Sequence, residues 1–193
     1  MDNKQKKLDF EIQQQQQFFW CWDAVGTSCA LYYAPLSGWT QCQVASTTFA
    51  PSEVPTGKCC GDHNNCVFNK IWSLDNPRKQ GSFRTTNIAN GYEEGAISFE
   101  KLMSELDQGR PVAYLLTIRL NPPVTVGIKV LDSFRHFVVV AEYEHNGEDQ
   151  MVTVHDPHYG TSEMSYEVFT DNYKAEAGGS VNYSFFTSPS INP

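Results

Sequence analysis

The first third of the chain carries the spacing of apolar residues that is typical of helices. Between residues 22 and 33 they recur at intervals of three and four, which places them on one helical face. Pro35 and Gly38 end this helix. A second helix is predicted over residues 40–49, then a loop over 51–65 and a short third helix over 66–74. The first helical face consists of Trp22, Val25, Cys29, Tyr32 and Tyr33.

The pattern becomes strand-like from Pro111, after one more helix. Ser98 is placed to cap a helix over residues 99–106, which Gly109 closes. Runs rich in β-branched and aromatic residues then predict strands, and Asn146-Gly147 is the strongest hairpin-turn signal. A last helix is predicted over residues 165–173. The predicted strands cover residues 112–120, 124–131, 135–143, 151–155 and 181–187, with Pro122-Pro123 breaking the first two apart.

Helices followed by antiparallel strands indicate an α+β fold. We expect one domain over residues 1–193, with a helical lobe over about 15–110 and a β lobe over about 111–193. The 193 residues suffice for a full core, and 40% hydrophobic and 13% aromatic residues favour a folded chain over a disordered one. No internal repeat is present.

Charge and hydropathy narrow the range of partners. The net charge is −8 and no basic stripe stands out, so we expect no nucleic acid partner. No apolar run approaches the roughly 18 residues that a membrane span needs. The N-terminal residues MDNKQKK include no apolar stretch, so no signal peptide is predicted. We expect a monomer.

All six cysteines lie in the first third of the chain: Cys21, Cys29, Cys42, Cys59, Cys60 and Cys66. If the first two are free, the other four allow two disulfides in three connectivities, among which the sequence does not choose. Disulfides would suit the proline- and glycine-rich loop and would imply an oxidising compartment. A zinc site lacks the usual C-x-x-C spacing, and reduced, buried thiols remain the plain alternative.

Cys21 is the first candidate for chemistry. It lies where the first helix begins, and unpaired N–H groups with the positive end of the helix dipole stabilise a thiolate there. By itself, such a cysteine is more often a buried core residue. A glutamine from the run at residues 13–17 would supply an amide donor for an oxyanion. A catalytic role for Cys21 therefore depends on a base later in the chain.

His136 and Asp156 supply the candidate base and its partner. His136 begins the predicted strand that contains Phe137–Val140, and Asp156 ends the strand that returns after Asn146-Gly147, so the open end of this hairpin brings the two together. The carboxylate would fix the tautomer and leave the other ring nitrogen for the thiol.

Two plain alternatives remain, a sheet-edge histidine and a turn-opening Asp156-Pro157. Strand alternation points His155 away from the face of Asp156. A metal site formed by His136, His155 and His158 lacks a recognised ligand spacing, so we predict no metal and no cofactor. His63 and His145 are expected in loops.

Taken in order, these motifs resemble papain-like cysteine peptidases. Gln15 precedes Cys21-Trp22 by six positions, His136 precedes the apolar run, and Asp156-Pro157 is followed by Gly160. The bacterial branch, with its secreted proteases and a plant-pathogen effector protease, is the most similar, also in residues 41–45 and in the cysteines at 59, 60 and 66. The resemblance covers roughly residues 15–169.

This resemblance implies a papain-like fold, with a helical lobe and a β lobe on either side of an active-site cleft. Cys21 would be the nucleophile, His136 the general base and acid, Asp156 its orienter, and Gln15 with the Cys21 N–H the oxyanion hole. Gln14 or Gln16 would substitute for Gln15 in a shifted register. Trp22 would pack behind the nucleophile. The implied substrate is a protein or peptide, and the implied location is secreted or effector-delivered.

Two residues depart from the family's pattern. Asp23 stands where a small residue is usual, and a carboxylate there disfavours a nearby thiolate. Arg135 stands where glycine is frequent before the histidine, and it would narrow the cleft or contact an acidic substrate group. The hypotheses are a peptidase acting through a thioester, a related acyl transfer such as deamidation, transglutamination or isopeptide cleavage, or an inactive binding module.

Overall fold

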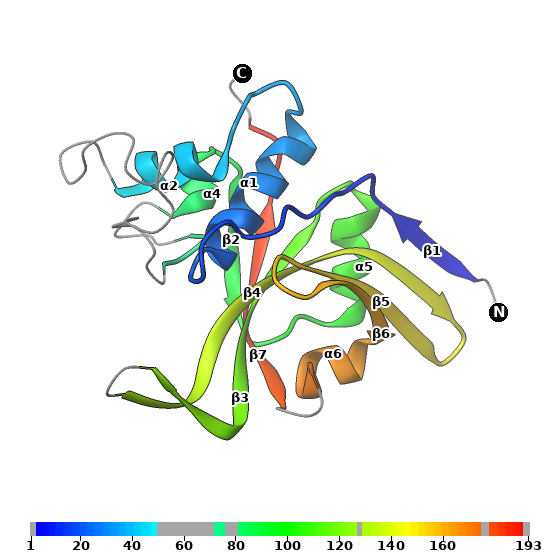
Figure 1. The fold of residues 1–193 in the computed structure, drawn as a ribbon. Coiled ribbons are helices and arrows are strands. Elements are labelled where there is room, and N and C mark those ends of the chain that lie inside the picture. The colour runs from blue at the N-terminus through cyan, green and yellow to red at the C-terminus, as the bar shows by residue number, and fades with distance from the viewer. Residues whose placement is uncertain (1–2, 50–71, 76–80, 127–128, 175–177, 191–193) are drawn as a thin grey trace.

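The computed structural model describes residues 3–49, 72–75, 81–126, 129–174 and 178–190. They form a mixed α/β fold around a seven-stranded antiparallel sheet (Figure 1). The strands run in the order β2-β7-β3-β4-β5-β6, and β1 pairs with the far end of β4. Their bounds are β1 Lys4–Lys7, β2 Ala89–Glu94, β3 Val112–Val126, β4 Lys129–Asn146, β5 Asp149–Asp156, β6 Gly160–Ser165 and β7 Gly179–Thr187.

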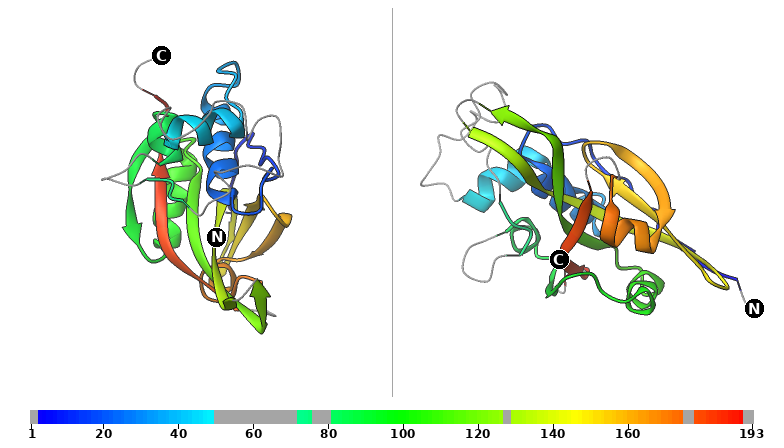
Figure 2. Two further views of the ribbon diagram at one scale, coloured as in Figure 1. Left: turned by 60° about the vertical axis from the view of Figure 1, so that its left-hand side comes forward. Right: turned by 90° about the horizontal axis from the view of Figure 1, so that it is seen from below.

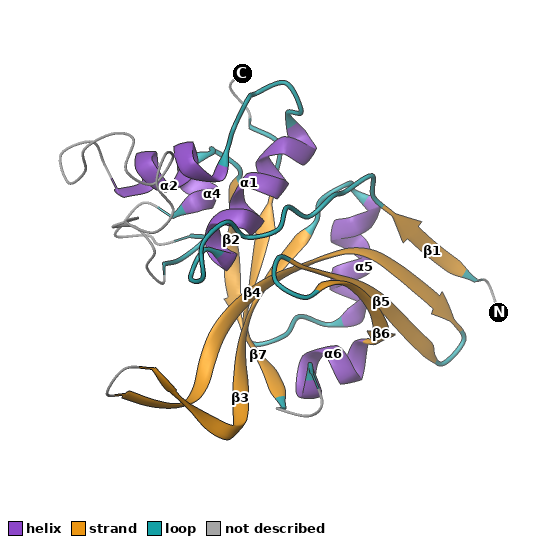
Figure 3. Ribbon diagram, in the orientation of Figure 1, coloured by secondary structure: helices purple, strands orange, loops and turns teal. Residues whose placement is uncertain are grey.

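The described helices form two groups around this sheet (Figure 3). α1, α2 and α4 contact one another, and α1 packs against β4. α5 packs against β1, β3 and β4, and α6 packs against β5, β6 and β7. Their bounds are α1 Cys21–Tyr33, α2 Gln41–Phe49, α4 Ser82–Thr85, α5 Phe99–Asp107 and α6 Tyr166–Asn172.

α1 is the buried helix predicted from its spacing of apolar residues. Its first ten residues are all buried, so the helix is buried on its polar positions as well as on the predicted apolar face. Gly26 allows α4 to approach closely, because a Cβ at this position would lie 2.3 Å from the Cβ of Ser82. The Ser82 hydroxyl donates to the Trp22 carbonyl at 3.0 Å, which ties the two helices together.

Two further helices begin at a serine cap, and the one at Ser98 was predicted. Ser98 accepts a hydrogen bond from the Lys101 amide at the start of α5, and Ser165 accepts one from the Val168 amide at the start of α6. Gly109 ends α5 with a φ of 74°, a conformation that glycine adopts without strain.

Strands β3 and β4 form a longer hairpin than the sequence predicts. The two segments expected over residues 112–120 and 124–131 do not form separate strands at Pro122-Pro123. Instead, β3 continues to Val126, and its pairing with β4 shifts register between Arg119 and Val124. Proline can occupy such an irregular position because the ladder is already interrupted there. The hairpin extends past the rest of the sheet (Figure 2).

Three strands of the structure were not predicted from the sequence. β1 lies in the polar N-terminal segment, for which no strand was predicted, and it pairs with β4 through residues 142–145. β2 lies within the expected helical lobe but pairs with β7 at the sheet edge. β6 is short and polar and returns directly after β5. None of the three has the apolar alternation that identifies a half-buried strand.

The predicted loop over residues 51–65 and most of the third helix over 66–74 lie outside the described residues. The Asn146-Gly147 turn is confirmed, since β4 ends at Asn146 and Asn146 pairs with Asp149. Among the described helices, none has the length and apolar character that crossing a membrane requires.

Candidate active site

Cys21 is the first residue of α1, at the edge of a cleft. Trp20 occupies the N-cap position without a side-chain cap hydrogen bond, and its carbonyl accepts from the amides of Asp23 and Ala24 at 3.0 and 2.8 Å. The thiol is free and nearly buried, with 8% of the residue exposed. A helix N-terminus at this depth stabilises negative charge on sulfur.

His136 and Asp156 meet across neighbouring strands. The His136 Nε2 lies 2.8 Å from the Asp156 Oδ1, and both residues are buried. His136 lies within β4 rather than at its start, because β4 begins at Lys129. Pairing of β4 with β5 starts at Val139, so β5 ends beside the histidine and places its last residue, Asp156, against the ring.

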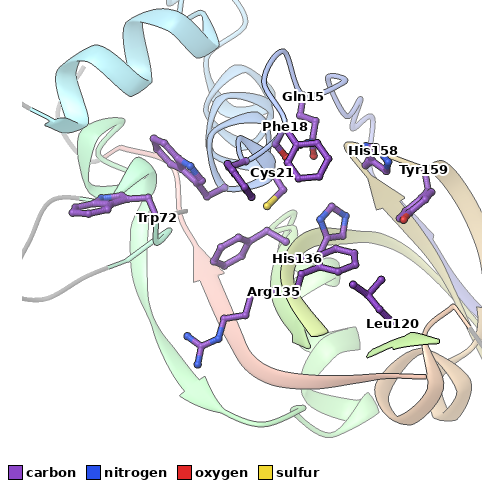
Figure 4. Close-up of a pocket in the computed structure, with 13 residues that line it drawn as sticks. Gln15, Phe18, Cys21, Trp72, Leu120, Arg135, His136, His158 and Tyr159 are labelled. Carbon is purple, nitrogen blue, oxygen red and sulfur yellow. The ribbon is translucent and has the colours of Figure 1, made fainter. Parts of the chain in front are cut away.

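Cys21 and His136 both line the cleft, and Figure 4 shows the sulfur of Cys21 beside the imidazole ring of His136. Since Nε2 faces the carboxylate, Nδ1 is left for the sulfur. Burial disfavours the charged imidazole. Hydrogen bonds to Asp156 and Cys21, with the negative charge of both groups, outweigh burial and raise the pKa of His136 to about 9. The arrangement favours the protonated, imidazolium form of His136.

Asp156 accepts hydrogen bonds on both carboxylate oxygens. The backbone amides of His158 and Tyr159 donate to Oδ1 at 2.7 and 2.9 Å, and the Tyr173 hydroxyl donates to Oδ2 at 2.7 Å. Burial raises the pKa of Asp156, but the hydrogen bond and charge of His136 and these donors outweigh burial and lower it. Tyr173, fully buried after α6, was missed because nothing near it in the sequence marks it as a partner of Asp156.

Gln15 lines the cleft, but its amide group faces the turn before Cys21. Its Nε2 donates to the carbonyls of Gln17 and Phe18 at 3.0 and 2.7 Å, while its Oε1 is buried without a partner. Its backbone amide donates to the Pro157 carbonyl at 2.9 Å, which ties the lead-in to the turn after Asp156. In this conformation both amide hydrogens of Gln15 are already engaged.

Gln41, in α2, holds the rest of the glutamine run in place. Its Nε2 donates to the Gln14 carbonyl at 2.9 Å, and its Oε1 accepts from the Gln16 amide at 2.9 Å. The side chains of Gln14 and Gln16 are exposed, and neither residue lines the cleft. Of the three glutamines considered for an oxyanion hole, Gln15 alone lines the cleft.

The two departures from the family's pattern lie in different surroundings. Asp23 is fully buried, and neither of its carboxylate oxygens has a hydrogen-bond partner. Burial raises the pKa of Asp23 well above its ordinary value, so the neutral acid is favoured and no anion is placed near the thiolate. Arg135 is exposed and lies at the cleft, where Figure 4 shows its guanidinium pointing away from the His136 ring.

Among the other described histidines and cysteines, His158 lines the cleft, whereas His145, His155, Cys29 and Cys42 do not. His155 stacks edge-on against Phe10 at 5.3 Å, and His145 contacts the Gly147 carbonyl at 3.0 Å. Among the described residues, no cluster of three His, Cys, Asp or Glu side chains is placed to hold a metal ion. Cys29 is a free buried thiol, and Cys42 is disulfide-bonded. The predictions for His63, Cys59, Cys60 and Cys66 fall outside the described residues.

Comparison with known proteins places this centre in a family. The model of the Peptidase_C39 like family matches residues 7–181. Among solved structures, a candidate C39-like peptidase from Bacillus anthracis matches with a TM-score of 0.50 and 14% identity, over 94% of this chain and 97% of that one. Identity this low shows a shared fold alone. No curated protein matches the chain. The family match spans nearly the whole domain and confirms the resemblance read from the motifs: the chain belongs to the C39-like family of papain-like cysteine peptidases.

Proposed function

We propose that this protein is a cysteine peptidase that hydrolyses peptide bonds through Cys21, His136 and Asp156. The observation that carries the proposal is the continuous chain of contacts from thiol to imidazole to carboxylate, with the thiol at a helix N-terminus. In this proposal, the group of α1, α2 and α4 and the sheet act as the two lobes of a papain-like fold. The free state of Cys21 weighs against an inactive binding module.

The proposed reaction starts with the thiolate of Cys21. Its sulfur attacks the carbonyl carbon of the scissile bond, and the carbonyl electron pair moves to oxygen. The imidazolium of His136 gives its proton to the leaving amine as the carbon–nitrogen bond breaks, which leaves a thioester. His136, now neutral, removes a proton from water, which attacks the thioester and releases the acid. The proton returns to form the imidazolium, and the thiolate is restored.

The oxyanion formed in each half-reaction needs donors, and the backbone N–H of Cys21 is the first. We propose Gln15 as the second. Its Nε2 now donates to the carbonyls of Gln17 and Phe18, so a rotation of the side-chain amide has to accompany substrate binding. Such a rotation replaces two neutral hydrogen bonds by one to a charged oxygen, which is roughly twice as strong as a neutral one.

The substrate is proposed to be a protein or peptide, and the active form a monomer. The disulfide at Cys42 supports an oxidising location, as expected for a secreted or effector-delivered protein.

The test is incubation of a denatured protein mixture with the wild-type chain and with the Cys21→Ala and His136→Ala variants. Mass spectrometry should find new peptide termini with the wild type only. Mass increases of one dalton at glutamine residues, without new termini, would show that the protein is a deamidase and not a peptidase. Termini that persist in Cys21→Ala would contradict the proposed nucleophile.

A further inference from the structure

The cleft next to Cys21 lies over an open edge of β4. Four consecutive residues of this strand, Phe134 to Phe137, line it. Side chains of neighbouring strand residues point to opposite faces, so a cavity that touches all four straddles the edge of the strand. Among the described residues, this stretch of β4 pairs with β3 on one side only, because the pairing of β4 with β5 begins at Val139.

The cleft has a volume of about 250 Å³, and most of the side chains that line it are apolar. On one flank, Trp22 and Trp72 both pack against Phe49, with ring centroids 5.8 and 4.7 Å apart. On the other flank, Phe134 and Tyr159 both lie edge-on to His136, each with centroids 6.1 Å away. Figure 4 shows Trp72 on one side of Cys21, and Leu120 and Tyr159 on the other, beyond His136.

The reacting atoms therefore lie between two apolar flanks. A peptide that extends along the edge of β4 would place its scissile carbonyl at Cys21 and residues from either side of that bond on the two flanks. Burying a large apolar side chain against a flank contributes about 1.5–3 kcal/mol to the binding free energy, whereas a glycine leaves that flank exposed to water. Phe18, at 69% exposure on the turn before Cys21, adds an aromatic surface at the rim.

We propose that the site selects extended protein segments that carry a large apolar side chain on each side of the scissile bond. One side chain packs against Trp72, which the buried Trp22 supports from behind, and the other packs against Leu120 and Phe134. The inference rests on the peptidase function proposed above and adds to it a substrate class. It predicts poor recognition of segments that have glycine at either position.

The test measures binding and cleavage separately, with one peptide series. The parent peptide carries phenylalanine on both sides of the scissile bond, and two relatives replace one or the other by glycine. Titration into the Cys21→Ala variant gives affinities without turnover. Each glycine should weaken binding by about tenfold or more. The wild-type chain should show the same order in kcat/KM.

Two variants assign the flanks, and a third serves as control. Leu120→Ala should reduce the preference at one peptide position, and Trp72→Ala at the other. Leu36→Ala removes a fully exposed leucine outside the cleft and should change neither preference. Equal affinity for all three peptides, or loss at both positions from Leu120→Ala alone, would overturn the inference. If the peptides bind selectively but the wild type does not hydrolyse them, the role of the apolar flanks in binding is supported and the peptidase function is refuted.

Discussion

Four hydrogen bonds converge on the carboxylate of Asp156, and each constrains the orientation of the His136 ring. One comes from His136 itself, two from the backbone of the following turn, and one from the Tyr173 hydroxyl. The backbone amides belong to the turn that ends β5, so they are fixed by the chain path. In the described part of the chain, Tyr173 is the one side-chain donor to Asp156 besides His136, which makes it a positioning residue whose hydrogen bond a single mutation removes.

Tyr173→Phe should lower kcat/KM by about tenfold, because a hydrogen bond to a charged group is worth about 1.5–3 kcal/mol. Losing this donor raises the pKa of Asp156, so the acidic limb of the pH–rate profile should move to higher pH. Tyr166→Phe is the matched control, since that buried hydroxyl donates to the Ile97 carbonyl and not to the catalytic centre. A pH profile that is unchanged in Tyr173→Phe would show that Tyr173 has no part in orienting Asp156.

Asp23 should make the protein less stable as the pH rises. Its pKa is raised in the folded state above its ordinary value of 3.8, so the folded chain binds the proton more tightly than the unfolded chain. This tighter proton binding contributes fully to the free energy of unfolding at pH values below 3.8. The contribution is lost as the pH rises through the pKa of Asp23 in the folded state. Asp23→Asn should therefore raise Tm at pH 8, by about 2–4 °C per kcal/mol gained.

The same substitution should have little effect at pH 4, because the folded wild-type chain keeps the Asp23 carboxyl neutral there and the variant carries an uncharged amide. Thermal unfolding of wild type and Asp23→Asn at the two pH values provides the comparison. A gain in Tm that is equal at pH 4 and pH 8 would show that charge burial is not the cause.

Among the elements, those with local signals were predictable from the sequence. α5 and α6 carry serine caps, and the β4–β5 turn carries Asn146-Gly147. The polar strands β1 and β6 have no such signal, because pairing with a neighbour and not burial of a face makes them strands. Pro122-Pro123 indicated a break, yet tertiary pairing carries β3 through it with a register shift.

The contact between α1 and α4 sets the position of the helix that carries Cys21. Gly26→Ala should destabilise the protein by about 1–3 kcal/mol, because the added methyl group overlaps Ser82. Chemical unfolding measures the loss. Adding Ser82→Gly removes the overlapping atoms and should recover part of the stability. If the double variant is less stable than the sum of the two single changes, steric overlap at this contact is not the cause.

At the scale of the whole molecule, the centre joins two distant parts of the chain. The lead-in and α1 supply Gln15 and Cys21, and the β4–β5 hairpin supplies His136 and Asp156. The sequence predicted that these residues meet, because a hairpin places its open ends together. It did not predict the contacts of Gln41 and Tyr173, since neither a helical glutamine nor a tyrosine after a helix has a pattern that identifies its distant partner.

The whole-molecule account also predicts the alkaline limit of activity. His136 has to be protonated to serve the leaving amine, and its pKa is about 9. Peptide hydrolysis should therefore fall as the pH rises through about 9, when the imidazolium loses its proton. Rates that keep rising to pH 10 would contradict this role of His136.

The most direct measurement of the central claim is the rate at which iodoacetamide alkylates Cys21, followed by mass spectrometry between pH 5 and pH 10. Cys29, a free but fully buried thiol of the same helix, is the internal control and should stay unlabelled while the protein is folded. The account predicts rapid labelling of Cys21 at pH 6 in the wild type and a rate at least tenfold lower in His136→Ala. Equal rates in the two proteins at pH 6 would contradict a thiolate–imidazolium pair and, with it, the proposed mechanism.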